Sequence, residues 1–284
     1  MLRKAINQHQ FMDVDITSIN QELTNIKFPA LILDCEFLNV SHKPKNNEFE
    51  DTLDIKRNED KVFLLQFSII RNFKDLIYRN NQTAIKHMDI LRNYKEKKYD
   101  FEKAHKSLVN SFLNVCKRKN IRTIICADTS AEKKLITSWL LKDVSPKISQ
   151  GLAFFNKDKS INMFDIYKLL KLAKFNNLKK DGSIFDATTK DKMIDLQSSK
   201  KIMNYYGKTD KLKPETSSIY EICINAYKYY SIDHGNINVD EFVELGKYLK
   251  EARDHCYNDV FMVAEILKFF KQLLIENQGQ NGKK

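Results

Sequence analysis

Two carboxylates stand at the end of an apolar segment in the stretch PALILDCEFLNV, residues 29–40. Asp34 follows the apolar run Ala30–Leu33, and Glu36 comes two positions later. Because side chains at positions i and i+2 of a strand point to the same face, the two carboxylates should lie side by side. Like charges at the end of a buried strand lose hydration and repel each other, and a bound divalent cation removes both penalties. The pair therefore predicts ligands for a hard cation such as Mg²⁺.

Two further segments offer acids beside a predicted buried element. Asp128 ends the apolar segment TIICAD, residues 123–128. In the stretch ARDHCYNDVFMVAEIL, residues 252–267, His255 and Asp259 stand four positions apart, which places them on one face of a helix. Histidine changes its protonation state near neutral pH and suits general-base chemistry. Three segments that are distant in the chain thus supply carboxylates and one imidazole.

Each of these residues also has a structural interpretation without chemistry. Asp34 and Glu36 would then form a solvated strand end, and Asp128 would cap the helix that follows its strand. His255 would be an exposed helix residue. The sequence leaves both interpretations open, most evenly for Asp128. Asp165, in NMFDIYKLL, is expected to cap its own helix and is not assigned to the site.

The elements that must position these side chains follow from apolar periodicity. Strands are predicted over residues 30–37, 62–70 and 121–128, with a candidate strand at 75–80 and a short strand running into a helix within 160–175. Helices are predicted over residues 15–26, 83–119, 130–141, 217–230 and 238–276, the last broken near Lys250. Strands and helices in this order predict an α/β fold, with helices on the faces of a mixed β-sheet.

The predicted domain organisation has three parts. Residues 1–28 form a polar N-terminal extension, and residues 29–270 form the main domain. Residues 271–284 hold the end of the last helix and a tail expected to be disordered. A Lys-rich insertion without clear periodicity occupies about residues 176–215 of the main domain. This insertion is either a phosphate-binding arm or a solvated loop, and the sequence does not choose between the two.

The charge of the chain favours a polyanionic partner. Its 284 residues are 42% hydrophobic and 30% charged, which is enough to bury a sizeable core. The formal net charge is +11 at pH 7, which favours nucleic acid as a partner. An evenly spread charge would instead suit a protein that does not bind nucleic acid.

The five cysteines are odd in number and lack paired spacing. Cys35, Cys126 and Cys256 lie in apolar or motif segments, so we expect reduced, small hydrophobic side chains there. The chain shows no apolar core of a signal peptide and no apolar run long enough to span a bilayer. These features predict a cytoplasmic protein with no membrane partner.

The motifs, taken in order, resemble the DEDD superfamily of 3′→5′ exonucleases, the DnaQ-like branch of the ribonuclease H-like fold. The resemblance covers roughly residues 29–270. It rests on Asp34-x-Glu36 in the first strand, the strand VFLLQFSII that follows, and His255 before Asp259 in a C-terminal helix.

The resemblance implies a ribonuclease H-like sheet and two-metal hydrolysis with Mg²⁺ or Mn²⁺, the ions about 3.5–4 Å apart. It implies that Asp34, Glu36 and Asp259 hold the first ion, with Asp34 bridging to a second ion held by Asp128. It assigns the general base to His255. The substrate would be RNA or single-stranded DNA, degraded from the 3′ end to 5′-nucleotides.

Two departures from the family pattern keep alternatives open. His255 precedes Asp259 by four residues, whereas the His-type branch of the family uses five. The family places its second Asp slightly later than Asp128, so Glu132 is the alternative ligand of the second ion. The competing function is a catalytically silent nuclease fold that binds nucleic acid or a partner protein. The choice between ribose and deoxyribose substrates depends on contacts to the 2′-hydroxyl, which the sequence does not identify.

Overall fold

The computed structural model describes residues 2–5, 10–45, 50–92, 99–127, 129–144, 146–178, 184–186, 203, 209–232 and 238–281. A five-stranded sheet with the order β5-β4-β3-β6-β7 forms its centre. The strands are β3 (Ala30–Leu38), β4 (Lys61–Ile70), β5 (Lys86–Asp89), β6 (Thr123–Cys126) and β7 (Met163–Asp165). β4 is antiparallel to β3 and β5, whereas β6 is parallel to β3 and β7. The fold is therefore α/β with a mixed sheet, as predicted.

The two long central strands owe their pairing to apolar runs, rich in Leu, Ile and Phe, that are buried along almost their whole length. Their register places Asp34 opposite Gln66. It shifts between Glu36 and Phe37 in a β-bulge or similar irregularity. Bulges bend a strand and re-aim its side chains, and they are frequent next to functional sites.

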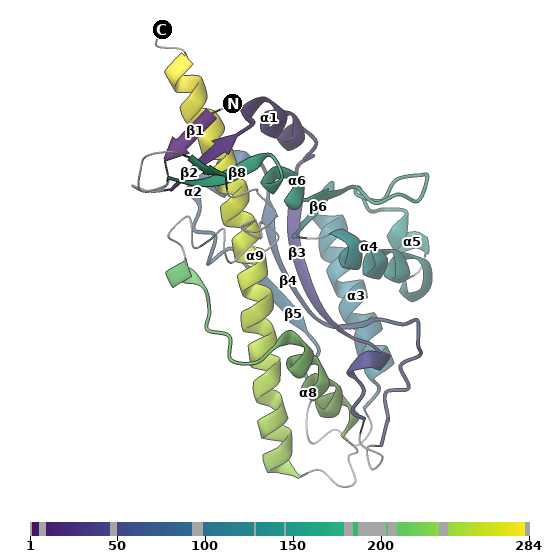
Figure 1. Ribbon diagram of the computed structural model, residues 1–284. Helices are drawn as coiled ribbons and strands as arrows, with labels where there is room; N and C mark the ends of the chain where they lie inside the picture. The colour runs from purple at the N-terminus through teal and green to yellow at the C-terminus, as the bar shows by residue number, and fades with distance from the viewer. Residues whose placement is uncertain are drawn as a thin grey trace.

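Helices cover both faces of the sheet (Figure 1). Helix α3 (Phe101–Arg118) packs with Leu31 and Leu33 in one buried cluster. Helix α9 (Val239–Asn281) packs with Ala30 and Ile32 in a second cluster. Because successive strand residues point to opposite faces, the two helices lie on opposite sides of β3. In Figure 1, α9 runs in front of β3, β4 and β5 over the height of the sheet.

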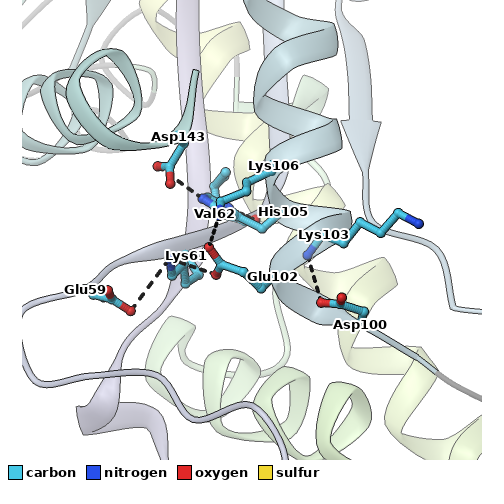
Figure 2. A network of polar contacts seen from close by, with 9 residues as sticks. All are labelled: Glu59, Lys61, Val62, Asp100, Glu102, Lys103, His105, Lys106 and Asp143. Atoms are coloured by element: carbon cyan, nitrogen blue, oxygen red, sulfur yellow. Dashed lines mark hydrogen bonds and ion pairs between the residues drawn. The ribbon is translucent and has the colours of Figure 1, made fainter. Parts of the chain in front are cut away.

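A polar network ties α3 to the start of β4 (Figure 2). The fully buried His105 lies with Nδ1 3.1 Å from the Val62 carbonyl oxygen, so Nδ1 donates, and its Nε2 lies 3.6 Å from Asp143 Oδ2. Lys61 contacts Glu102 Oε2 through Nζ at 2.8 Å. These side chains lie between helix and sheet, where a buried polar group without a partner would be costly.

A second sheet, with the order β1-β2-β8-β9, lies near the C-terminal half of α9 (Figure 1). Its strands are Leu2–Ala5, Gln10–Val14, Ala173–Leu178 and Ile184–Asp186. β2 pairs antiparallel with β8 from Gln10 opposite Asn177 to Val14 opposite Ala173. The N-terminal extension and the beginning of the predicted insertion therefore form one structural unit.

The remaining elements are short helices. They are α1 (Ile16–Thr24), η1 (Val40–His42), α2 (Phe73–Tyr78), α4 (Thr129–Ser138), the π-helical η2 (Trp139–Asp143), α5 (Pro146–Ser149), α6 (Tyr167–Leu170), η3 (Thr209–Lys211) and α8 (Ile219–Ser231). No helix among the described residues combines the length and apolar character needed to cross a bilayer. All five cysteines are buried, and none of them forms a disulfide bond.

Several predicted elements are wrong in detail. The candidate strand at 75–80 is helix α2, because Asn72 caps it by accepting a hydrogen bond from the Asp75 amide at 3.0 Å. The predicted helix 83–119 begins only at Phe101, and β5 occupies part of its first half. Within 160–175, the helix ends at Leu170 and β8 follows.

The C-terminal helix also differs from the prediction. α9 is continuous for 43 residues, without a break near Lys250. Leu245, Leu249 and Ala252 are buried on one side of this stretch, so packing holds the helix together across its charged segment. The helix continues through Asn281, so most of the tail expected to be disordered is helical, and residues 282–284 lie outside the described part.

Candidate metal centre

Strand β3 carries its two acids on the face that α9 covers. Asp34 and Glu36 continue the row of Ala30 and Ile32, which pack against the apolar part of α9. Toward the N-terminus of α9, that apolar part gives way to the turn from His255 to Asp259. The acids of the strand and the polar turn of the helix therefore face each other where the apolar contact ends.

The closest group of possible metal ligands, at the place where β3 meets this turn of α9, consists of Asp34, Glu36 and Cys256. One carboxylate oxygen of each acid and the Sγ atom of Cys256 all lie within 4.8 Å of one another. Glu36 is 6% exposed and Cys256 is fully buried, whereas Asp34 is partly exposed. No other group of three metal-binding side chains this close occurs in the part of the chain that the structure describes.

The acids shift one another's pKa strongly. Burial raises the pKa of Asp34 well above its ordinary value of 3.8, and the charges of Asp259 and Glu132 raise it further. A hydrogen bond donated by the Cys256 thiol opposes this rise. Burial, followed by the charges of Asp34, Asp259 and Glu132, likewise raises the pKa of Glu36 well above 4.5. Four carboxylates from β3, α4 and α9 thus share one electrostatic environment.

The surroundings of the Glu36 carboxylate suit a bound cation. Among the described residues, its carboxylate has no hydrogen bond and no ion pair with a basic side chain. The charges that raise its pKa all belong to other acids. A buried carboxylate normally has a charged or hydrogen-bonded partner, and a divalent metal ion supplies one. Oxygen ligands from several acids are the donors that Mg²⁺ and Mn²⁺ prefer.

In the described part of the chain, the candidate ligand from the second acid motif is Glu132. Asp128 lies outside the described residues. Glu132 stands in the first turn of α4, its Oε2 atom is shielded from solvent, and its charge acts on both Asp34 and Glu36. The acid that the sequence offered as the alternative therefore approaches the cluster.

His255 lies between two carboxylates. Its Nε2 atom is 3.7 Å from Asp259 Oδ2, and its Nδ1 atom is 3.4 Å from Glu215 Oε1. The His255 side chain is 22% exposed, so a water molecule can reach it. A proton on Nδ1 that points toward Glu215 leaves Nε2 as the acceptor nearest the acid cluster.

Asn258 holds Glu215 in place. The fully shielded Asn258 side chain accepts a hydrogen bond from the Lys213 amide at 2.7 Å. It also donates to the Lys213 carbonyl oxygen at 3.0 Å and to Glu215 Oε1 at 2.8 Å. This pairing fastens the segment before α8 to the helix that carries the histidine.

Two contacts fix the position of α9 over the sheet beside the site. Gln66, opposite Asp34, donates a hydrogen bond to the Arg253 carbonyl oxygen at 2.5 Å. The Arg253 side chain donates from Nε to Asp89 Oδ2 of β5 at 2.6 Å. The turn that carries His255 and Asp259 is thus attached to two strands.

Sequence reasoning missed two neighbours of the site. Cys256 was expected to be an inert hydrophobic side chain, although its spacing of three residues from Asp259 places the two on neighbouring positions of the helix surface. No feature of the sequence indicates that Glu215 belongs to the site. It lies in a short polar stretch whose approach to His255 depends on tertiary structure. Asp165 accepts a hydrogen bond from the Tyr167 amide at 2.8 Å, but the N-cap residue of α6 is Ile166, one position later than the predicted cap.

No protein-family model, no curated protein and no solved structure matches this chain. The function of the site is therefore inferred from its own geometry and chemistry.

Proposed function

We propose that this protein is a metal-dependent 3′→5′ exonuclease that hydrolyses RNA or single-stranded DNA on a ribonuclease H-like fold. One observation carries the proposal: carboxylates from β3, α4 and α9 share one partly buried spot beside a histidine. Burial raises the pKa of Asp34 and Glu36 at this spot, and the charges that raise it further all belong to other acids, so the ionised cluster is electrostatically unfavourable. Bound divalent cations remove that penalty.

The residues divide into ligands and a base. Asp34, Glu36 and Asp259 would hold the first cation, and Glu132 or Asp128 the second. When bound, such ions activate a water molecule and stabilise the charge that develops on the phosphate and the leaving oxygen. His255 takes the proton of the attacking water at Nε2, while Glu215 orients the ring through Nδ1.

The substrate class follows from charge and from the resemblance of the motifs. A net charge of +11 favours a polyanion, and phosphodiester hydrolysis is a reaction that paired cations on carboxylates perform. Attack from the 3′ end is proposed from the motif order alone. The products would be 5′-nucleotides.

The test uses oligonucleotides labelled at the 3′ end, as RNA and as DNA, with Mg²⁺ or Mn²⁺. We expect release of a labelled mononucleotide as the first product and no release with EDTA. Asp34→Asn and Asp259→Asn should each lower the rate by more than about 100-fold, because loss of an outer-shell partner alone often costs about 10–100-fold. Asp240→Asn, an exposed acid in the first turn of α9, is the matched control and should leave the rate unchanged.

Two results would contradict the proposal. If the wild type and both site variants hydrolyse the oligonucleotides at equal rates, any hydrolysis takes place at another site. Oligonucleotide binding without any Mn²⁺ site that depends on Asp34, measured by calorimetry, would select the catalytically silent alternative.

A further inference from the structure

The Cys256 thiol occupies the position of a ligand within the acid cluster. Its Sγ atom and carboxylate oxygens of Asp34 and Glu36 lie within 4.8 Å of one another. Helix α9 places it directly after His255 and three residues before Asp259, and its side chain is fully buried. The thiol therefore points to the same spot as the acids, from the element that supplies the third carboxylate.

The surroundings of Cys256 differ from those of a cysteine that only packs. Burial raises the pKa of the Cys116 thiol in α3, and no neighbouring charge contributes to that rise. Burial also raises the pKa of the Cys256 thiol, and the charges of Asp34 and Glu36 add to the effect there, as they do at Cys35. Among the cysteines, all of which the structure describes, only Cys256 has its Sγ atom within 4.8 Å of a carboxylate oxygen of each of these acids. Nearby, Glu36 has no basic partner in the described part of the chain, although it is 6% exposed. The thiol and both acids therefore face one place whose chemistry suits a cation.

The donor set has consequences for the identity of the cation. Carboxylates alone suit Mg²⁺, which accepts oxygen ligands and keeps much of its water. A thiolate is a soft ligand that favours Zn²⁺ and other late first-row ions over Mg²⁺. A mixed set of two carboxylates and one thiolate is therefore not the set that a Mg²⁺ site requires.

We propose that Cys256 Sγ is a direct ligand of the cation held by Asp34 and Glu36, and that this centre prefers late transition-metal ions to Mg²⁺. The inference rests on the proposed function, because it concerns the same centre. Coordination replaces the S–H bond by an S–metal bond, and the proton passes to the buffer. In the metal-free protein the same thiol donates its hydrogen bond to Asp34.

The test is a titration of the metal-free, full-length protein with Co²⁺, followed by absorption spectroscopy. Co²⁺–thiolate bonds give charge-transfer absorption in the near ultraviolet, whereas Co²⁺ bound only by oxygen and nitrogen ligands does not. We expect this absorption in the wild type and in Cys116→Ala. It should be lost in Cys256→Ala and Cys256→Ser, the second of which keeps a small polar group in the buried position.

Calorimetry of the same variants gives the second readout. Cys256→Ala should weaken Zn²⁺ binding by at least about tenfold, because loss of a mere outer-shell partner already costs about 10–100-fold. Mg²⁺ binding should change by less than about twofold, since Mg²⁺ gains little from a soft ligand.

The outcomes separate this inference from the proposed function. Co²⁺ binding that depends on Asp34 but shows no charge-transfer band in the wild type would overturn the thiolate ligand and leave the exonuclease intact. A band lost in Cys35→Ala or Cys223→Ala rather than in Cys256→Ala would also overturn it, because Cys35 and Cys223 are two further buried thiols acted on by Glu36. Absence of any Asp34-dependent cation site would overturn both proposals. If the Cys256 variants fail to fold, absence of the band in the wild type overturns the inference, whereas a wild-type band that is retained when each of the other cysteines is replaced supports it.

Discussion

At the scale of single residues, Glu132 is the candidate ligand of the proposed second cation that lies in the described part of the chain. Glu132 acts electrostatically on both carboxylates of β3, and its Oε2 atom is shielded from solvent. An acid that only capped α4 would face the amides of its own helix. Glu132 is thus the described residue best placed to complete a two-cation centre with Asp34.

We predict that Glu132→Gln lowers the rate of oligonucleotide hydrolysis by at least about tenfold and raises the Mn²⁺ concentration needed for half-maximal rate. The amide keeps the size of the side chain and removes its charge. The measurement is the initial rate across a Mn²⁺ series. Glu221→Gln is the matched control, because Glu221 is an exposed acid in the first turn of α8.

A comparison with Asp128→Asn completes this experiment. If Asp128 holds the second cation, Asp128→Asn will lower the rate of hydrolysis strongly and Glu132→Gln will lower it only slightly. A wild-type rate and Mn²⁺ dependence in Glu132→Gln would remove Glu132 from the site.

At the scale of elements, α9 is the part that assembles the centre. Its apolar stretch packs on the sheet, while the turn before it carries His255, Cys256 and Asp259 to the acids of β3. The Arg253–Asp89 contact attaches this turn to β5, and both side chains are largely shielded, at 34% and 13% exposure. Charged hydrogen bonds of this kind contribute more than exposed ion pairs.

We predict that Asp89→Asn lowers the free energy of unfolding by about 1.5–3 kcal/mol, the range for hydrogen bonds to charged groups. Urea denaturation measures this change. Glu244→Gln breaks the Lys247–Glu244 pair on the same helix, where both side chains are more than half exposed at 63% and 66%. That control should lose less than about 1 kcal/mol. Equal losses in the two variants would mean that the Arg253 contact does not anchor α9.

At the scale of the whole molecule, the acid cluster opposes folding when no metal is bound. The raised pKa values of Asp34 and Glu36 mean that the folded protein holds these protons to higher pH than the unfolded chain does. Below the ordinary values of 3.8 and 4.5, both states are protonated and the cluster carries no penalty. As pH rises through and above these values toward the raised ones, the unfolded state is favoured.

We predict that, in EDTA, wild-type stability falls more steeply as the pH rises above about 4 than that of the double variant Asp34→Asn/Glu36→Gln. Near pH 7 the inactive double variant should be the more stable protein. Saturating Mn²⁺ should raise the Tm of the wild type alone, because a ligand that binds only the folded state stabilises it. Denaturant unfolding across the pH series measures the first effect. Parallel pH profiles for the two proteins would show that the carboxylates do not repel each other in the fold.

Apolar patterning alone predicts the elements whose residues are buried on both faces. The strands near 30–37 and 62–70 can be predicted because their apolar runs, rich in Leu, Ile and Phe, bury almost every side chain. The spacings Asp34-x-Glu36 and His255 to Asp259 likewise fix which side chains share a face, because that follows from strand and helix geometry alone.

Tertiary structure decided everything that depends on a distant partner. β5 has the polar sequence KHMD and is a strand only because β4 offers it hydrogen bonds. α9 continues past Lys250 because α8 and the sheet bury one side of a charged stretch. Glu215 meets His255 through Asn258, and Cys256 becomes a candidate ligand only because α9 lies over Asp34. Local spacing sets the face on which a side chain lies, whereas packing between remote segments sets what that face meets.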